Sequence, residues 1–130
     1  LSKKYNDFDI WVDVAHNVLG FRALRSWIEY NNTINPIFII GLGIKKDYKG
    51  ILKEIKKTDP GLICFLSELN FHSHKPEKLK QFATKLKINT FIGEGITETL
   101  DYLKSKYKKN NLILITGSIG LVGDVLNKNN

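Results

Sequence analysis

Several short segments of this sequence carry side chains that could bind or act on a charged ligand. A carboxylate and an imidazole can exchange a proton or contact a sugar, and a lysine or hydroxyl beside glycines can contact an anion. The residues concerned are Asp13, His16 and Asn17 in DVAHN, Lys46 and Asp47 in GLGIKKD, His72 in HSH, and Ser118 in GSIG. Each of these segments follows an apolar run, so their proximity depends on the fold.

Asp13 ends an otherwise apolar run, where a carboxylate is poorly solvated unless it has a partner such as a sugar diol or His16. Its short side chain could instead cap the following helix or bond local backbone groups. His16 could be a base, a ligand contact or an ordinary histidine at a helix start. The residues alone leave these alternatives open.

Residues 117–123 read GSIGLVG and superficially suggest a glycine-rich phosphate loop. They lack the Lys-Ser/Thr ending of a Walker loop and do not match Gly-x-Gly-x-x-Gly. Gly117 could form a turn after a strand with Ser118 as a helix cap, or Ser118 could contact an anion such as a substrate carboxylate. A hydrolase using Ser118, His16 and Asp13 is disfavoured because the Gly-x-Ser-x-Gly elbow is missing.

A metal site built from Asp13, His16, His72 and His74 is also disfavoured, because His-x-His without a third ligand at fixed spacing is not a zinc signature. The single cysteine, Cys64, lies in the apolar run LICFL. This position predicts a buried, inert thiol and fits a reducing, intracellular compartment.

The elements that must position these residues alternate along the chain. Apolar or β-branched runs at 8–14, 37–42, 62–66, 90–92 and 112–116 predict strands, and the intervening periodicity predicts helices at 19–30, 48–57, 76–86, 96–108 and 119–126. This order predicts one Rossmann-like α/β domain over residues 1–130, a three-layer αβα arrangement with a mainly parallel sheet of five to six strands. In such a sheet the carboxyl ends of the strands share one edge, where ligands bind beside helix amino termini.

The charge distribution and the lengths of the apolar runs disfavour two classes of partner. The net charge of +7 invites a nucleic-acid interpretation, yet the lysines are spread over helices that also carry Glu and form no single block. No run approaches the roughly 20 apolar residues of a membrane span, and the first residues lack the apolar stretch of a signal peptide. We therefore expect a soluble domain whose partners include neither nucleic acid nor a membrane.

The segments also resemble a known family. Residues 13–17 (DVAHN) are similar to the Asp-Gly-Ala-His-Asn-Pro motif that opens the carboxyl-terminal domain of folylpolyglutamate and dihydrofolate synthases, within the Mur ligase superfamily. Residues 41–47 resemble that family's Gly-Met-Leu-x-x-Lys-Asp segment, and residues 115–123 resemble its closing Phe-Gly-Ser stretch. Val14 and Val18 replace the family's Gly and Pro, and His72 stands about where an Arg often precedes the third helix.

The resemblance implies a Rossmann-like carboxyl-terminal domain of an ATP-dependent ligase. In such enzymes an amino-terminal P-loop domain binds ATP and Mg²⁺ and activates a substrate carboxylate as an acyl phosphate, which the amino group of L-glutamate attacks. By resemblance, Asp13, His16 and Asn17 bind ATP. Lys46, Asp47 and His72 line the cleft between the domains, and Ser118 lies by the incoming glutamate.

The sequence contains no Walker loop, and the resemblance therefore predicts a domain that is catalytically incomplete by itself and works with its own amino-terminal ATPase domain. The expected small molecules are ATP, L-glutamate and dihydropteroate or folates, in the cytoplasm or in mitochondria. The alternative is a non-catalytic nucleotide- or anion-binding α/β module.

Overall fold

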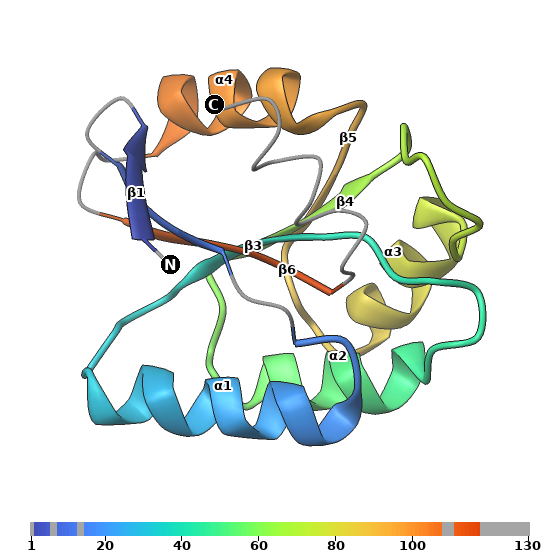
Figure 1. Cartoon of the computed structure of the whole chain (residues 1–130), viewed down its shortest axis with the longest axis horizontal. Coiled ribbons are helices and arrows are strands. Elements are labelled where there is room, and N and C mark those ends of the chain that lie inside the picture. The colour runs from blue at the N-terminus through green and yellow to red at the C-terminus, as the bar shows by residue number, and fades with distance from the viewer. Residues whose placement is uncertain (1, 6–7, 13–14, 108–110, 118–130) are drawn as a thin grey trace.

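A computed structural model describes residues 2–5, 8–12, 15–107 and 111–117 of the chain. Strands and helices alternate through most of it (Figure 1). In chain order the elements are β1 (Ser2–Tyr5), β2 (Phe8–Val12), α1 (Val18–Tyr30), β3 (Ile37–Ile40), α2 (Tyr48–Lys56), β4 (Leu62–Leu66), α3 (Pro76–Lys85), β5 (Thr90–Gly93), α4 (Ile96–Lys106) and β6 (Leu112–Thr116). The predicted helix at 119–126 lies outside the described residues.

The strands form one six-stranded sheet in the order β1-β2-β6-β3-β4-β5. The five strands from β2 to β6 are parallel to one another, and β1 pairs antiparallel with β2 at the edge of the sheet. This confirms the predicted α/β class and the mainly parallel sheet. The prediction omitted β1, and it extended β3 by two residues beyond Ile40, where the structure ends that strand.

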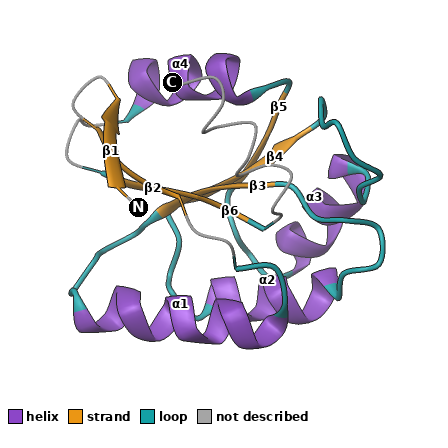
Figure 2. Ribbon diagram, in the orientation of Figure 1, coloured by secondary structure: helices purple, strands orange, loops and turns teal. Residues whose placement is uncertain are grey.

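The helices cover the two faces of the sheet unequally (Figure 2). Helices α1, α2 and α3 pack on one face, and α4 packs on the other. The first three crossovers progress across the sheet in one direction, and the fourth returns to insert β6 between β2 and β3. Because βαβ crossovers are right-handed, a reversal of direction places the helix on the opposite face.

The central strands supply both halves of the core. In β3, Phe38 and Ile40 pack among α1, α2 and α3, while Ile37 and Ile39 pack on the α4 side. All four are fully buried, as expected for a parallel strand covered on both faces. Cys64 in β4 is also buried, and burial raises the pKa of its thiol to about 12. The predicted burial of this cysteine is confirmed.

A buried carboxylate joins α1 to α2. Glu54 of α2 is 3% exposed and accepts from Arg22 Nε at 3.1 Å, while Lys57 Nζ lies 2.9 Å from its other oxygen. Arg25 of α1 lies 3.8 Å from the same carboxylate and 3.2 Å from Glu29 on its own helix. The Lys57 hydrogen bond, aided by Arg22 and Arg25, lowers the pKa of Glu54 below its usual value of 4.5, against the opposing effect of desolvation.

Left-handed residues end three of the units on the amino-terminal side of the sheet. Asn32, Asp59 and Lys87 have φ near +53°, +53° and +61°, and each follows a helix and precedes a strand. Asp59 begins the sequence DPG, in which proline and glycine favour a turn between the helix and the next strand. Over the described residues, no helix combines the length and apolar character needed to cross a bilayer.

Candidate functional site

Three chain segments meet where β2, β6 and β3 end. The Ala15 carbonyl oxygen, after β2, accepts from the backbone N–H of Gly117 at 2.9 Å and from the hydroxyl of Thr116 at 3.1 Å. Gly117 has φ near +113°, and a Cβ placed there would lie 2.8 Å from the carbonyl oxygen of Gly41. Glycine is therefore required at this position, and the segments after β2, β6 and β3 are in contact at the carboxyl edge.

The start of α1 presents His16 and Asn17 at this edge. Asn17 is the N-cap of α1, and its Oδ1 accepts from the backbone N–H of Gly20 at 2.8 Å. The Nδ2 group is then the part of this side chain that can donate to a phosphate or ribose oxygen. Both residues border a cavity of about 420 Å³ between β2 and α1. His16 is half-buried.

The start of α2 lies against the start of α1. Asp47 caps α2 by accepting from the backbone N–H of Gly50 at 3.0 Å. A Cβ on Gly50 would lie 2.8 Å from Cγ2 of Val18, so the two first turns touch. Two helix amino termini thus point to one region of the carboxyl edge, and their partial positive charges favour an anion there.

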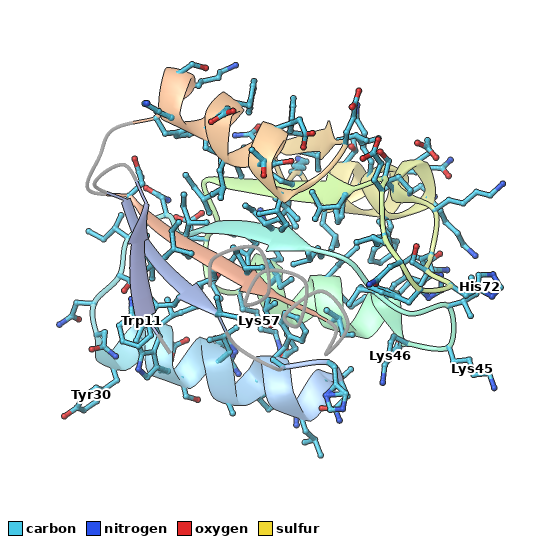
Figure 3. The ribbon with its side chains drawn as sticks, turned by 45° about the horizontal axis from the view of Figure 1, so that its top comes forward. Trp11, Tyr30, Lys45, Lys46, Lys57 and His72 are labelled. Atoms are coloured by element: carbon cyan, nitrogen blue, oxygen red, sulfur yellow. The ribbon has the colours of Figure 1, made fainter. Side chains whose placement is uncertain are left out.

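The loop after β3 and the loop after β4 are joined by backbone hydrogen bonds. Ile44 N–H donates to the His72 carbonyl at 3.0 Å, and His74 N–H donates to the Leu42 carbonyl at 2.9 Å. Gly43 and Ser73 form an antiparallel bridge between these bonds. The pairing places His72 beside the lysine-containing loop, and Figure 3 shows Lys45, Lys46 and His72 extending outward at the same end of the molecule.

The buried side chain of His74 also links these two loops. Its Nε2 lies 2.9 Å from the carbonyl oxygen of Lys46. A carbonyl can only accept, so Nε2 carries the proton. The other ring nitrogen, Nδ1, is buried with no hydrogen-bond partner among the described residues, and the ring contacts Tyr48 at 4.8 Å between centroids. The sequence suggested His74 only as a member of a metal site, and its role in joining the two loops was missed.

Lysines are held over aromatic rings next to these loops. The Lys78 ammonium lies 5.3 Å from the centroid of Tyr48, and the Lys49 ammonium lies 5.7 Å from that of Phe82. Tyr48 and Phe82 themselves make an edge-to-face contact at 5.9 Å. These contacts restrict two cations near the starts of α2 and α3, which adds to the preference for an anionic ligand on this side of the edge.

The structure brings together five of the seven predicted site residues: His16, Asn17, Lys46, Asp47 and His72 all follow strands at the carboxyl edge. Asp13 and Ser118 lie outside the described residues. Within residues 15–107 and 111–117 and the two described amino-terminal segments, no three His, Cys, Asp or Glu side chains gather as metal ligands do. Which molecule each of the seven residues binds stays a prediction.

The chain matches the profile of the family described as "Dihydrofolate synthetase, C-terminal domain" over residues 1–128. The chain belongs to this family. No curated protein sequence matches it. The family assignment confirms the resemblance seen in the DVAHN, GLGIKKD and GSIG segments.

Solved structures similar to this family member share its fold. A Mycobacterium tuberculosis folylpolyglutamate synthase complexed with ADP superposes with a TM-score of 0.80 at 18% identity, over 92% of this chain and 29% of that one. An E. coli FolC in complex with ADP gives 0.79 at 18% identity, over 95% and 29%. A Thermotoga maritima folylpolyglutamate synthase gives 0.69 at 21% identity, over 98% and 29%. The chain thus spans under a third of the length of these structures.

Proposed function

We propose that this chain is the carboxyl-terminal domain of an ATP-dependent dihydrofolate or folylpolyglutamate synthase, which ligates L-glutamate to dihydropteroate or folate through an acyl phosphate. The domain would help to bind ATP and glutamate and would be inactive alone. The observation that carries the proposal is the meeting of His16, Asn17, Lys46 and Asp47 at two adjoining helix starts, in a member of this family. Relatives of the same fold bind ADP, and one binds both ADP and DHPP.

The proposed task of this domain is positioning. The α1 start would approach the nucleotide, with His16 beside the ribose or phosphates and Asn17 donating from Nδ2. Lys46 and Asp47 would line the cleft toward the second domain, with His72 on the paired loop. Holding the nucleotide and the amine in a reactive geometry can supply several kcal/mol, on the order of 7–11 in favourable cases.

Asp13 has the proposed role of a contact to the ATP ribose or the nearby phosphates, and Ser118 that of a contact to the incoming glutamate. Ala15, two residues after Asp13, and Gly117, which precedes Ser118, share the 2.9 Å hydrogen bond described above. That bond joins the two segments in which the proposed contacts occur, which supports a shared site.

Magnesium chemistry is assigned to the second domain. One relative was solved with AMPPNP and a manganese ion. We propose that ATP and the amino-terminal P-loop domain hold Mg²⁺, where it would neutralise phosphate charge during formation of the acyl phosphate.

The test is steady-state kinetics of the ligase formed by this domain and its amino-terminal ATPase domain. His16→Ala should raise the KM for ATP about tenfold or more, because a hydrogen bond to a charged group is worth roughly 1.5–3 kcal/mol. The control is His72→Ala, which should leave the KM for ATP unchanged and raise that for glutamate or the folate substrate. Equal ATP kinetics for wild type and His16→Ala would remove the nucleotide assignment, and a lack of ligase activity with ATP, glutamate and dihydropteroate or folate would remove the proposed function.

The alternative of a non-catalytic nucleotide-binding module gives a different result. It predicts that the 130-residue chain alone binds ATP with submillimolar affinity in calorimetry. The ligase proposal predicts little heat for the isolated domain, because most phosphate contacts would belong to the other domain.

A further inference from the structure

Helix α1 has a second apolar stripe that its own domain buries only in part, at Trp27. The residues that face the core are Phe21, Leu24 and Ile28. The outward stripe consists of Leu19, Ala23, Trp27 and Tyr30, spaced so that they share one side of the helix, and we call it the outer stripe. Leu19 is 70% exposed and Tyr30 is 86% exposed. The opposite flank of α1 carries the Arg22 and Arg25 contacts to Glu54, so the outer stripe faces away from α2.

Two grooves run beside this stripe and meet at a pair of tryptophans. Trp11 of β2 contacts Trp27 at 4.8 Å between ring centroids. Both tryptophans border the cavity of about 420 Å³ that ends at His16 and Asn17, and both also border a second cavity of about 490 Å³ that ends at Ile34. The first cavity exists partly because Gly20 and Ala23 fill little space on α1. The first cavity is lined mainly by apolar groups, and exposed apolar surface of this kind marks a contact surface.

The sheet register shows which polypeptide reaches this surface. Ser2 of β1 pairs with Trp11, and Tyr5 pairs with Phe8, so β1 runs backward along β2. Followed toward the amino terminus, β1 therefore runs toward the end of β2 at which Trp11 and Val12 lie. A polypeptide that precedes residue 1 would leave the sheet next to Trp11 and close to the first groove.

We propose that the segment immediately preceding residue 1, in the ligase proposed above, lies in the groove between β2 and α1 and packs apolar side chains against Trp11, Trp27 and Ala23. The inference rests on the proposed function in one respect, because it requires a domain that precedes this one. The solved relatives are long enough for such a domain, since this chain covers only 29% of their length. The groove ends at His16 and Asn17, so the same segment would bring the ATPase domain to the carboxyl edge where the nucleotide is proposed to bind. The docked segment would thus fix the orientation of the two domains.

A linear segment fits this surface better than a compact ligand. The outer stripe follows α1 for most of its 13 residues, a length of about 20 Å at 1.5 Å per residue. The first cavity is lined mainly by apolar groups between Trp27 and the polar groups at His16 and Asn17, whereas the second is lined mainly by polar residues: Asn31, Asn32, Thr33 and Asn111. Tryptophans at the centre of such a surface are the residue type that most often dominates protein contacts.

The test is hydrogen exchange on the two-domain ligase, followed by mass spectrometry of peptides from the segment preceding residue 1. In wild type, amides of this segment should exchange about tenfold or more slowly than in Ala23→Phe, since each buried large apolar side chain is worth on the order of tenfold in an equilibrium constant. Ala23→Phe fills the groove from an exposed helix position. The matched control is Ser26→Phe, an exposed position on the same helix that does not border either groove, and it should keep the protection.

Three results would overturn the inference. The segment could exchange as fast in wild type as in Ala23→Phe, or Ser26→Phe could remove protection as well as Ala23→Phe does. Protection that rises with protein concentration would instead assign the groove to a second copy of the chain. Ligase activity measured on the same samples separates the proposals, because an active enzyme with an unprotected segment refutes the docking alone.

Discussion

Glu54 is the residue whose charge should contribute most to stability outside the apolar core. The perturbation is Glu54→Gln, which keeps the shape and one acceptor oxygen and removes the charge. Glu54 faces Lys57 at 2.9 Å, Arg22 at 3.1 Å and Arg25 at 3.8 Å, so the substitution leaves three cations without their shared carboxylate. The matched control is Glu29→Gln, which removes a 3.2 Å partner of the same Arg25 from a site that is 58% exposed.

The expected change in the free energy of unfolding depends on how far each partner of Glu54 is buried. A charge pair near 4 Å is worth about 1 kcal/mol in water and about 4 kcal/mol at an effective dielectric constant of 20. The Arg22 and Lys57 side chains are 54% and 57% exposed, so their contributions belong near the lower value, and the Arg25 side chain at 24% lies between the two. Removing the carboxylate also relieves its desolvation. We expect Glu54→Gln to lower the free energy of unfolding by about 1–2 kcal/mol, and Glu29→Gln by less than about 0.5 kcal/mol.

The assay is urea unfolding of the 130-residue chain followed by circular dichroism at pH 7 and at pH 3. The folded state holds the pKa of Glu54 below 4.5, through Lys57 first and the arginines second. Stabilisation by this group is therefore complete above the unfolded pKa and is lost as the pH falls through the lower folded value. The difference between wild type and Glu54→Gln should shrink toward pH 3. Equal effects of Glu54→Gln and Glu29→Gln at pH 7, or a difference that persists unchanged well below the folded pKa, would refute the electrostatic explanation.

Three further outcomes follow from the packing. Gly93→Ala places a Cβ 2.0 Å from Thr99 Oγ1 and should cost about 1–3 kcal/mol in urea unfolding, whereas Gly43→Ala, whose nearest neighbour is 3.8 Å away, should cost less than about 0.5 kcal/mol. Cys64, with a thiol pKa of about 12, should not react with a thiol reagent at pH 8 until the chain unfolds, and rapid labelling of the folded chain would contradict its burial. Asn17→Ala should cost about 1 kcal/mol through loss of the helix cap, and Asn17→Ser should restore most of it; equal stability of both variants would exclude the cap.

The sequence predicts those elements whose pattern is set by burial on both faces. The strands at 37–42, 62–66 and 112–116 are nearly continuous apolar runs, which few other structures tolerate, and even the weak run at 90–92 forms β5. The edge strand β1, with sequence SKKY, has no such pattern, and it forms a strand by pairing with β2. Lysines are common on edge strands because they discourage pairing with another chain, and the two lysines of β1 fit its place at the edge.

The candidate site was predictable only in part. Strand ends in a parallel sheet share an edge, so the placement of His16, Asn17, Lys46 and Asp47 at one edge follows from the α/β class alone. The place of His74 does not, because its hydrogen bond to Lys46 depends on β3 and β4 being neighbours and on the pairing of two irregular loops. No local pattern encodes which loop lies beside which.

Strand β6 is the last described element of the chain, yet it lies near the middle of the sheet, between β2 and β3. Until residues 112–116 have been synthesised, β2 with β1 on one side and β3 with β4 and β5 on the other have no backbone bonds between them. In the finished sheet β6 pairs with both parts, and the Ala15–Gly117 hydrogen bond is made by the residue that follows it, so one strand completes both the sheet and the proposed nucleotide edge.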